Sequence, residues 1–281
     1  MRLVGDLAAD TQVAGDAGRY TARLSRAWEI WGPNGGYLAA IALRAAGAHS
    51  RFDHPASIVG HFLGVARFDE VQLDVTTLRA AKRAESMRVS MTQQGEPVFE
   101  ALVWTTGDVN GLEHDRTTFP ATFEPESVPS SAERIAAAGG ESMYPFWDNF
   151  DQRTQHWYPT PEEWERRLPS NPTFEQWLRY VPTATFDDPW VDACRSLILI
   201  DTLGWPAACN LHVGGAYVAP SIDLACAFHR SRPEEPWLFA QAHSSSAGGG
   251  LVGCEARVWS RDGTLLAVGS SQLLCRPAPP R

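Results

Sequence analysis

The chain has 281 residues, of which 44% are hydrophobic and 20% charged, so its composition excludes a disordered or collagen-like protein. Its formal net charge is −9, which disfavours a general nucleic-acid binder because such a protein needs a basic face for phosphates. No apolar run approaches the ~20 residues that a membrane-spanning helix needs, and we expect no membrane association.

The first half of the chain predicts one long helix followed by antiparallel strands. Apolar residues recur at helical spacing within residues 31–47, where Asn34 and Gly35 begin the helix and Gly47 ends it. Three alternating stretches then predict strands, at residues 58–65, 71–79 and 86–106, the last of them containing a turn near Gly95.

The middle of the chain has a different composition. Residues 107–140 are rich in proline, serine and acidic residues, as is typical of a linker. In the aromatic segment that follows, we expect strands at 144–153 and 174–181 with a proline-rich loop between them. We therefore divide the chain into an N-terminal domain (1–110), a linker (111–140) and a C-terminal domain (141–281).

The second half repeats the order of the first. Residues 192–210 predict an apolar helix, and residues 243–250 (HSSSAGGG) predict a flexible turn or bulge. Strands are expected at 220–230, 237–244, 251–260 and 264–275, with a hairpin turn at Asp262 and Gly263. Because both helices are apolar on nearly all sides, we expect an α+β protein in which each antiparallel sheet wraps around its own helix.

Several classes of chemistry are disfavoured by missing motifs. Lys82 is the only lysine and follows Ala81, which excludes a P-loop, and the chain has no G-x-S-x-G nucleophile elbow. No two of the five cysteines are spaced as C-x-x-C, so we expect no metal site. The N-terminus lacks a secretory signal, and the reduced cytoplasm is the expected compartment.

The order and spacing of six segments resemble the acyl-CoA thioesterase II family, the TesB-type enzymes with two fused hotdog domains. The resemblance covers nearly the whole chain except the linker and the aromatic middle. It implies hydrolysis of an acyl-CoA substrate without a metal or an organic cofactor. The segments are GGYLAAIALRAA, GHFLGVARFDE, TLRAAKRAESMRVSMTQQGEPVFEA, ILIDTLGWPA, PSIDLACAFHR and DGTLLAVGSSQLLCR.

Thioester hydrolysis needs a base that activates water, and Asp201 is the first candidate. It follows four apolar helix residues, and burial of its carboxyl would raise the pKa and make it a better base. The alternative is a helix aspartate that bonds to nearby backbone or lies on an exposed edge. The resemblance places the family's catalytic aspartate at this position.

Two further polar residues match places at which the family orients the attacking water. Ser221 stands where the resemblance implies a threonine, and it keeps the hydroxyl; the alternative is a solvent-facing strand serine. Gln272 matches the family's glutamine in the last strand, but counting back from Arg276 points to Ser271. Because one register step turns a side chain to the other face, either a bulge restores Gln272 or Ser271 occupies the site, and we favour Gln272.

The start of the first helix is the expected oxyanion site. Unpaired N–H groups at a helix N-terminus favour negative charge, and glycine allows a close approach. The resemblance implies that Gly36 supplies the N–H, while Gly35 is equally explained as an ordinary helix start.

Coenzyme A carries phosphates, so an acidic protein needs a local basic patch to bind it. The only dense basic stretch in the first half contains four candidates, which are otherwise explained as a solvated surface: Arg79, Lys82, Arg83 and Arg88.

Two other functions remain open: a non-catalytic acyl-CoA or lipid-binding protein, and an acyl-CoA hydratase. The hydratase is disfavoured because no histidine follows Asp201 within helical reach. We also expect a homo-oligomer, because fused hotdog domains present sheet edges and apolar faces.

Overall fold

A computed structural model describes residues 3–278 except 122, 159 and 214–215. The helices are α1 (Leu7–Asp10), α2 (Gly35–His49), α3 (Ser131–Ala137), α4 (Pro161–Arg166), α5 (Pro189–Thr202) and α6 (Gly204–Leu211), with 3-10 turns η1 (Arg26–Trp28), η2 (Pro125–Ser127) and η3 (Pro145–Asn149). The strands are β1 (Ala14–Asp16), β2 (Arg19–Arg23), β3 (His54–Phe62), β4 (Glu70–Ala80), β5 (Ala84–Gln93), β6 (Glu96–Thr106), β7 (Phe150–Arg153), β8 (Thr173–Tyr180), β9 (Tyr217–Val218), β10 (Asp223–Phe228), β11 (Leu238–Gly248), β12 (Leu251–Ser260), β13 (Leu265–Leu274) and β14 (Arg276–Pro277).

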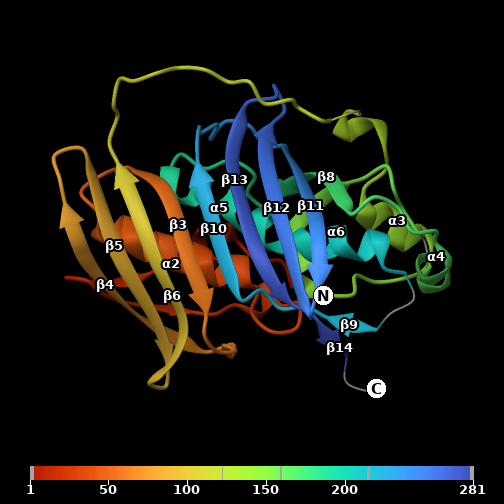
Figure 1. Ribbon diagram of the computed structural model, residues 1–281, viewed down its shortest axis with the longest axis horizontal. Coiled ribbons are helices and arrows are strands. Elements are labelled where there is room, and N and C mark those ends of the chain that lie inside the picture. The colour runs from red at the N-terminus through yellow and green to blue at the C-terminus, as the bar shows by residue number, and fades with distance from the viewer. Residues whose placement is uncertain (1–2, 122, 159, 214–215, 279–281) are drawn as a thin grey trace.

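Twelve of the strands form one continuous antiparallel sheet. Its order is β1-β2-β4-β5-β6-β3-β10-β13-β12-β11-β8-β7, so the strands of the first half occupy one side and those of the second half the other (Figure 1). The two halves join where β3 pairs with β10, with Val59 opposite Ala225. The sheet is therefore shared by two units that each have one long central helix, the double hotdog arrangement that was expected.

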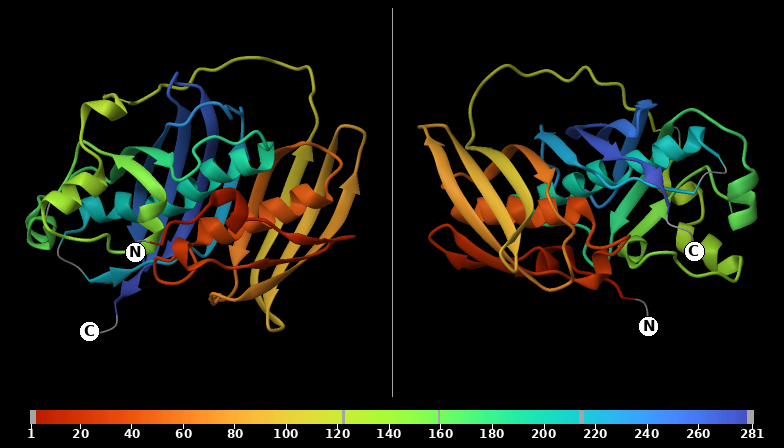
Figure 2. Two further views of the ribbon diagram at one scale, coloured as in Figure 1. Left: turned by 180° about the vertical axis from the view of Figure 1, so that it is seen from behind. Right: turned by 60° about the horizontal axis from the view of Figure 1, so that its bottom comes forward.

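Helices α2 and α5 lie together on one face of this sheet (Figure 2) and pack against each other. They run in opposite directions, because Gly36 near the start of α2 contacts Asp201 near the end of α5, while Gly47 near the end of α2 lies against Trp190. Most side chains of both helices are buried, as their apolar sequences predict. The alanines of α2 are small enough to let the two helices approach closely.

The apolar stretch at 192–210 forms two helices instead of the single helix that was predicted. The reason is Pro206, which has no N–H to donate to the carbonyl of Thr202 four residues earlier, so the helix breaks after Thr202. The break brings Gly204 against β12 and β13, where a Cβ would lie 2.8 Å from the Cys254 sulfur.

Two short helices form where linker or loop was expected. The predicted linker contains α3, and the predicted proline-rich loop contains α4; each begins with a reciprocal capping box, at Ser130 with Glu133 and at Thr160 with Glu163. Of the strand predicted at 144–153, only the last four residues form a strand, which is β7. The preceding residues form the turn η3, which begins at Pro145. The division of the chain at residues 110 and 140 stays a prediction.

The segment before α3 crosses the sheet and covers part of its outer face, which is the face away from α2 and α5. Phe119 in this segment contacts the rings of Trp177, Phe239 and Trp259, which lie on three neighbouring strands. The long connection is visible at the top of Figure 1. It therefore closes over an aromatic cluster that the sheet alone would leave exposed.

The stretch after His243, where a flexible turn or a bulge was expected, forms a bulge followed by a turn. The pairing of β11 with β12 shifts register between His243 and Ser246, which is a bulge. Gly249 and Gly250 then turn the chain with φ of 61° and 82°, conformations that favour glycine.

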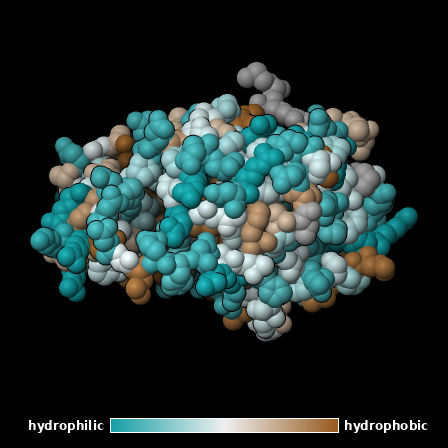
Figure 3. Space-filling model, turned by 90° about the horizontal axis from the view of Figure 1, so that it is seen from above, coloured by the Kyte–Doolittle hydropathy of each residue, from teal (hydrophilic) through white to brown (hydrophobic). Residues whose placement is uncertain are grey.

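Polar and charged side chains cover most of the face seen in Figure 3, and its hydrophobic side chains lie in separate small groups. Val59, Leu102 and Trp104 are large hydrophobic residues that are exposed on the outer face of the sheet. Among the residues that the structure describes, no helix is both long enough and apolar enough to cross a membrane.

Candidate active site

The Asp201 carboxylate lies at the junction of the two halves. Its Oδ2 accepts a 2.7 Å hydrogen bond from the backbone N–H of Gly36, 165 residues away in sequence, and the side chain is buried. Its Oδ1 is also buried and has no partner at hydrogen-bonding geometry among the described residues. One oxygen atom is thus held while the other is left to accept a proton.

Burial raises the pKa of Asp201 to about 6, because a charged carboxylate is poorly solvated inside the protein. The hydrogen bond from the Gly36 N–H and the nearby Ser221 hydroxyl favour the charged form and oppose part of this increase in the pKa. A carboxyl with this pKa is largely ionised at neutral pH and is more basic than an exposed aspartate. This is the property that a general base requires.

A polar contact next to the carboxylate fixes the two helices together. Asn34 caps α2 by accepting a 2.9 Å hydrogen bond from the Tyr37 N–H, and its side-chain amide donates to the Thr202 hydroxyl at 3.2 Å. Thr202 in turn donates to the carbonyl of Ile198 at 2.7 Å. The start of α2 is therefore attached to the end of α5 immediately beside Asp201.

A side chain on either glycine at the start of α2 would displace a neighbouring group. A Cβ on Gly36 would lie 2.7 Å from the Ile198 Cα, and a Cβ on Gly35 would lie 2.8 Å from Asp201 Oδ2. The Gly36 N–H, expected to face the substrate, points to the carboxylate instead. The Gly35 N–H has no hydrogen-bond partner among the described residues.

Ser221 lies in the segment that leads into β10, where it forms a bridge with Leu273 of β13. Its hydroxyl is close enough to Asp201 to affect the pKa of the carboxyl, as the expected site requires. Asp223, two residues later, accepts a 2.7 Å hydrogen bond from the Gln272 N–H and so ties β10 to β13. The Asp223 carboxylate thus stabilises the pairing of β10 with β13.

The register of β13 turns Ser271 toward the helices and Gln272 away from them. Between residues 269 and 274, β13 pairs with β12 without a shift, so there is no bulge that would reverse the alternation. A Cβ on Gly269 would touch Ile200 of α5, and a Cβ on Gly204 would lie 3.6 Å from the Ser271 hydroxyl. The structure therefore brings Ser271, and not the favoured Gln272, to the helix side of the sheet.

Ser271 is buried, and its hydroxyl has no hydrogen-bond partner among the described residues. Cys254 lies opposite Ser271 on β12, and burial raises the pKa of its thiol to about 11, with the Asp201 charge adding to this effect and the Ser244 hydroxyl opposing it. At neutral pH Cys254 is therefore a neutral thiol and not a nucleophile.

The predicted basic residues do not join this site. The β4–β5 turn that contains Lys82 lies at the other end of α2, because Arg51 beyond that end pairs with Glu85 at 3.1 Å and donates to the Ala81 carbonyl. Helix α2 has 15 residues and is about 22 Å long. Arg88 lies on the outer face of the sheet, where it pairs with Glu100 at 3.4 Å.

Three residues beside the carboxylate were not predicted as part of the site: Thr202, Cys254 and Phe62. Each comes from an element whose apolar pattern indicated core, and nothing in the local sequence distinguishes them from core residues. Among the described residues, no group of three or more histidine, cysteine or acidic side chains is arranged to hold a metal ion.

Models of two protein families match most of the chain. The acyl-CoA thioesterase N-terminal domain matches residues 24–106, and the acyl-CoA thioesterase C-terminal domain matches residues 125–275.

Solved structures share the complete fold. A conserved protein of unknown function with a hot dog fold from Alicyclobacillus acidocaldarius is 18% identical, with a TM-score of 0.76 over 99% of this chain and 100% of that one. Acyl-CoA thioesterase II TesB2 from Mycobacterium marinum is 21% identical, with a TM-score of 0.76 over 97% of this chain and 99% of that one. The tesB protein of Mycobacterium avium subs paratuberculosis is 22% identical, with a TM-score of 0.76 over 98% of this chain and 99% of that one. The chain therefore belongs to the acyl-CoA thioesterase family and is a thioester hydrolase with a TesB-like double hotdog fold.

Proposed function

We propose that this enzyme hydrolyses acyl-CoA to the free acid and CoA with a water molecule that Asp201 activates. The observation that carries this proposal is the asymmetry of the carboxylate. Oδ2 is held by the Gly36 N–H, whereas Oδ1 is buried without a partner at hydrogen-bonding geometry, and the pKa of about 6 suits a base at neutral pH.

In the reaction, Oδ1 takes a proton from water as the water oxygen bonds to the thioester carbonyl carbon. The tetrahedral intermediate then collapses, the carbon–sulfur bond breaks, and the proton held by Asp201 passes to the leaving CoA sulfur. The products are the carboxylic acid and CoA, and the carboxylate is restored. Atoms and charge balance without a metal ion or an organic cofactor.

The start of α2 supplies the charge stabilisation that the intermediate needs. The Gly36 N–H keeps the carboxylate in place, so the unpaired Gly35 N–H and the positive end of the α2 dipole are the groups available to the oxyanion. This assignment moves the oxyanion donor from the expected Gly36 to its neighbour.

Two hydroxyl groups are available to orient the attacking water. Ser221 lies beside the carboxylate, and the unpartnered hydroxyl of Ser271 is buried on the same side of the sheet as α5 and α6. A hydroxyl can accept from water and donate to it at the same time. We therefore assign this role to Ser221 and Ser271 rather than to Gln272.

We also propose that the protein functions in the reducing cytoplasm. All five cysteines are free, and three of them are buried within the core. Such thiols are maintained without disulfides in that compartment.

Replacing Asp201 by asparagine tests the base. We expect Asp201→Asn to lower kcat about 10²- to 10⁴-fold, because asparagine has a similar size but cannot accept a proton from water. Release of CoA from a series of acyl-CoA substrates measures this effect. Calorimetric binding of the same substrates should remain, and unchanged turnover in the variant would contradict the mechanism.

The raised pKa of Asp201 predicts how activity depends on pH. Because the ionised carboxylate is the active form, kcat should rise about tenfold per pH unit below pH 6 and level off above it. A pH–rate profile between pH 4.5 and about 8 measures this. A flat or falling profile below pH 6 would rule out a base with this pKa.

Stability provides a second measure of the same pKa. The folded-state value of about 6 exceeds the ordinary value of 3.8, so the folded protein binds this proton more tightly than the unfolded chain. The resulting stabilisation is complete below about pH 4 and is lost as the pH rises through about 6, an effect of about 3 kcal/mol. Denaturant unfolding should show this loss in the free energy of unfolding of the wild type relative to Asp201→Asn, because the other titrating groups are common to both proteins.

The register of β13 predicts unequal effects of two neighbouring substitutions. Ser271→Ala should lower kcat about tenfold, as expected for one lost hydrogen bond to the water, without lowering the melting temperature, because the hydroxyl has no protein partner. Gln272→Ala should change kcat less than about twofold, since its side chain faces away from the helices. If Gln272→Ala lowered kcat more than Ser271→Ala, Gln272 and not Ser271 would be the residue that orients the water.

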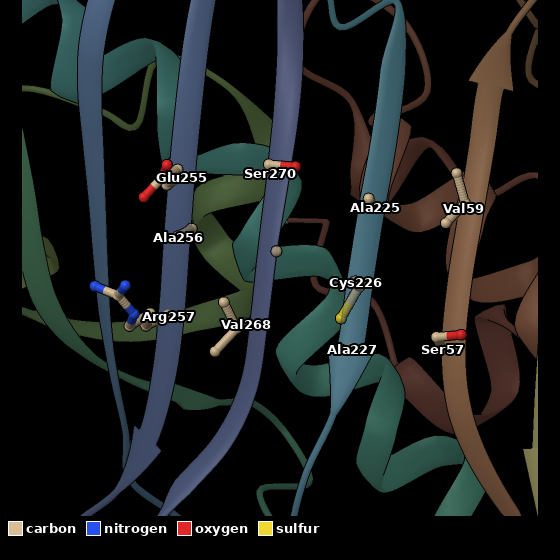
Figure 4. A pocket seen from close by; sticks show the side chains of 11 residues that line it. Ser57, Val59, Ala225, Cys226, Ala227, Glu255, Ala256, Arg257, Val268 and Ser270 are labelled. Carbon is tan, nitrogen blue, oxygen red and sulfur yellow. The ribbon is translucent and has the colours of Figure 1, made fainter. Parts of the chain in front are cut away.

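We further propose that two copies of the chain associate through the outer face of the sheet. Three exposed apolar side chains lie side by side there: Val59 on β3 is opposite Leu102 on β6, and Trp104 is 40% exposed. Beside them is a shallow hollow over β10 and β13, lined by Ala225, Ala227, Val268 and Ser270 among others (Figure 4).

The charges around this apolar strip favour a second copy as the partner. On one side Arg88 pairs with Glu100, and on the other side Arg257 and Glu255 lie on β12 (Figure 4). Because each side carries both signs of charge, a twofold arrangement exists in which Arg88 and Glu100 of one copy face Glu255 and Arg257 of the other.

A charge in this strip should separate the copies. We expect the wild type to have at least twice the mass of the monomer in solution, and Trp104→Glu to shift the mass toward 30.9 kDa. Leu112→Glu, a change at an exposed linker residue, is the matched control and should leave the mass unchanged. Sedimentation velocity measures the mass of the wild type and of both variants. A monomeric wild type would contradict the proposed interface.

A further inference from the structure

Asn34 is hydrogen bonded through every polar group that it has. Its N–H donates to the Trp28 carbonyl at 3.0 Å, and its carbonyl accepts from the Leu38 N–H at 3.1 Å. Its side chain caps α2 at Tyr37 and also reaches Thr202 of the other central helix. Because only 7% of its surface is exposed, the residue has one fixed position at the start of α2.

The direction of each hydrogen bond around this side chain is set by groups that can only donate or only accept. The Tyr37 N–H can only donate, so the Asn34 amide oxygen faces it and the amide nitrogen faces Thr202. The Ile198 carbonyl can only accept, so the Thr202 hydroxyl gives its hydrogen to that carbonyl and accepts from Asn34. Serine, threonine and aspartate also cap helices, but among these residues only asparagine has an N–H donor on a second atom.

The contact from Asn34 ends on the residue that follows the base. Thr202 is the last residue of α5, and Asp201 lies in the same final turn. The start of α2 rests on the backbone of this turn, since a Cβ on Gly36 would lie 2.7 Å from the Ile198 Cα and 2.9 Å from the Ile198 oxygen. The contact therefore determines how closely the Gly36 N–H approaches the carboxylate.

We infer that Asn34 and Thr202 form a clamp that positions the Asp201 carboxylate for the reaction. The inference rests on the proposed function. The clamp acts through the carboxylate: it holds the last turn of α5 so that Oδ2 stays on the Gly36 N–H and Oδ1 keeps its direction. A misplacement of about 1 Å in a reacting group costs about 10²-fold in rate.

Replacing Thr202 by valine removes the hydroxyl and keeps the shape of the side chain. We expect kcat to fall about 10- to 100-fold while KM stays within about twofold, because the base moves and the substrate-binding surfaces do not. The midpoint of the pH–rate profile should move above about 6, since a weaker hydrogen bond from the Gly36 N–H raises the pKa of Asp201. Thr202→Ser retains the hydroxyl and should leave the midpoint unchanged and kcat within about threefold of wild type.

Asn34→Ser tests the other side of the clamp. Serine retains a helix cap but does not reach Thr202, so this variant should reproduce the effects of Thr202→Val. Because both substitutions remove the same contact, the double variant should lose less than about twofold beyond the more affected single variant. Losses that multiply in the double variant would show that the two residues act separately and would overturn the inference.

Arg44→Met is the matched control. Arg44 of α2 pairs with Asp188, the residue that caps α5, and so joins the same two helices at their opposite ends. Removing this ion pair should lower the melting temperature and leave kcat and the pH midpoint at their wild-type values. If Arg44→Met lowered kcat as much as Thr202→Val, any contact between the helices would have the same effect and the clamp would have no role of its own.

A failure of the proposed function can be told apart from a failure of the clamp. If Asp201→Asn retains full turnover, Asp201 is not the base. The pKa of Asp201 can still be measured without turnover, from the pH dependence of the free energy of unfolding of each protein relative to its own Asp201→Asn counterpart. A higher pKa in Thr202→Val than in the wild type and Thr202→Ser would support the clamp, and equal values in all three would overturn it.

Discussion

The hydrogen bond from the Gly36 N–H to Asp201 Oδ2 is the interaction on which the rest of the site depends. It joins the start of one central helix to the end of the other, and therefore one half of the chain to the other half. Its 2.7 Å length requires a close approach of the helices, which only glycine allows at position 36, because a Cβ there would lie 2.7 Å from the Ile198 Cα. The Asn34–Thr202 hydrogen bond holds the same two helix ends in place.

This arrangement balances two opposing effects on the carboxylate. Burial makes its charge costly, while the Gly36 N–H, the Ser221 hydroxyl and the dipole of α2 favour the charge. If burial acted alone, the pKa of the carboxyl would be higher and less of it would be ionised at neutral pH. If the hydrogen bonds dominated, its pKa would be low and its basicity weak. The enzyme thus keeps at its centre a group that lowers its stability at neutral pH.

Much of the fold could be predicted from local patterns. Apolar runs located α2 and α5, and alternating residues located most strands of the sheet, because burial against one face imposes these periods. The two capping boxes at Ser130 and Thr160 were readable in the sequence, yet proline-rich surroundings made both segments resemble loop. Pro206 was likewise a readable signal for the break between α5 and α6.

By itself the sequence determined the duplicated order of elements, which follows from periodicity. It offered Asp201, a polar residue within an apolar helix, as a candidate base, and the resemblance to the thioesterase family favoured that interpretation over an exposed aspartate. Only the tertiary structure decided which groups meet that acid. Gly36 is 165 residues away from Asp201, and the choice between Ser271 and Gln272 depends on how β13 pairs with its neighbours. The register of a strand cannot be read from its own residues, because it is set by hydrogen bonds to other strands and by packing against helices that are far away in the chain.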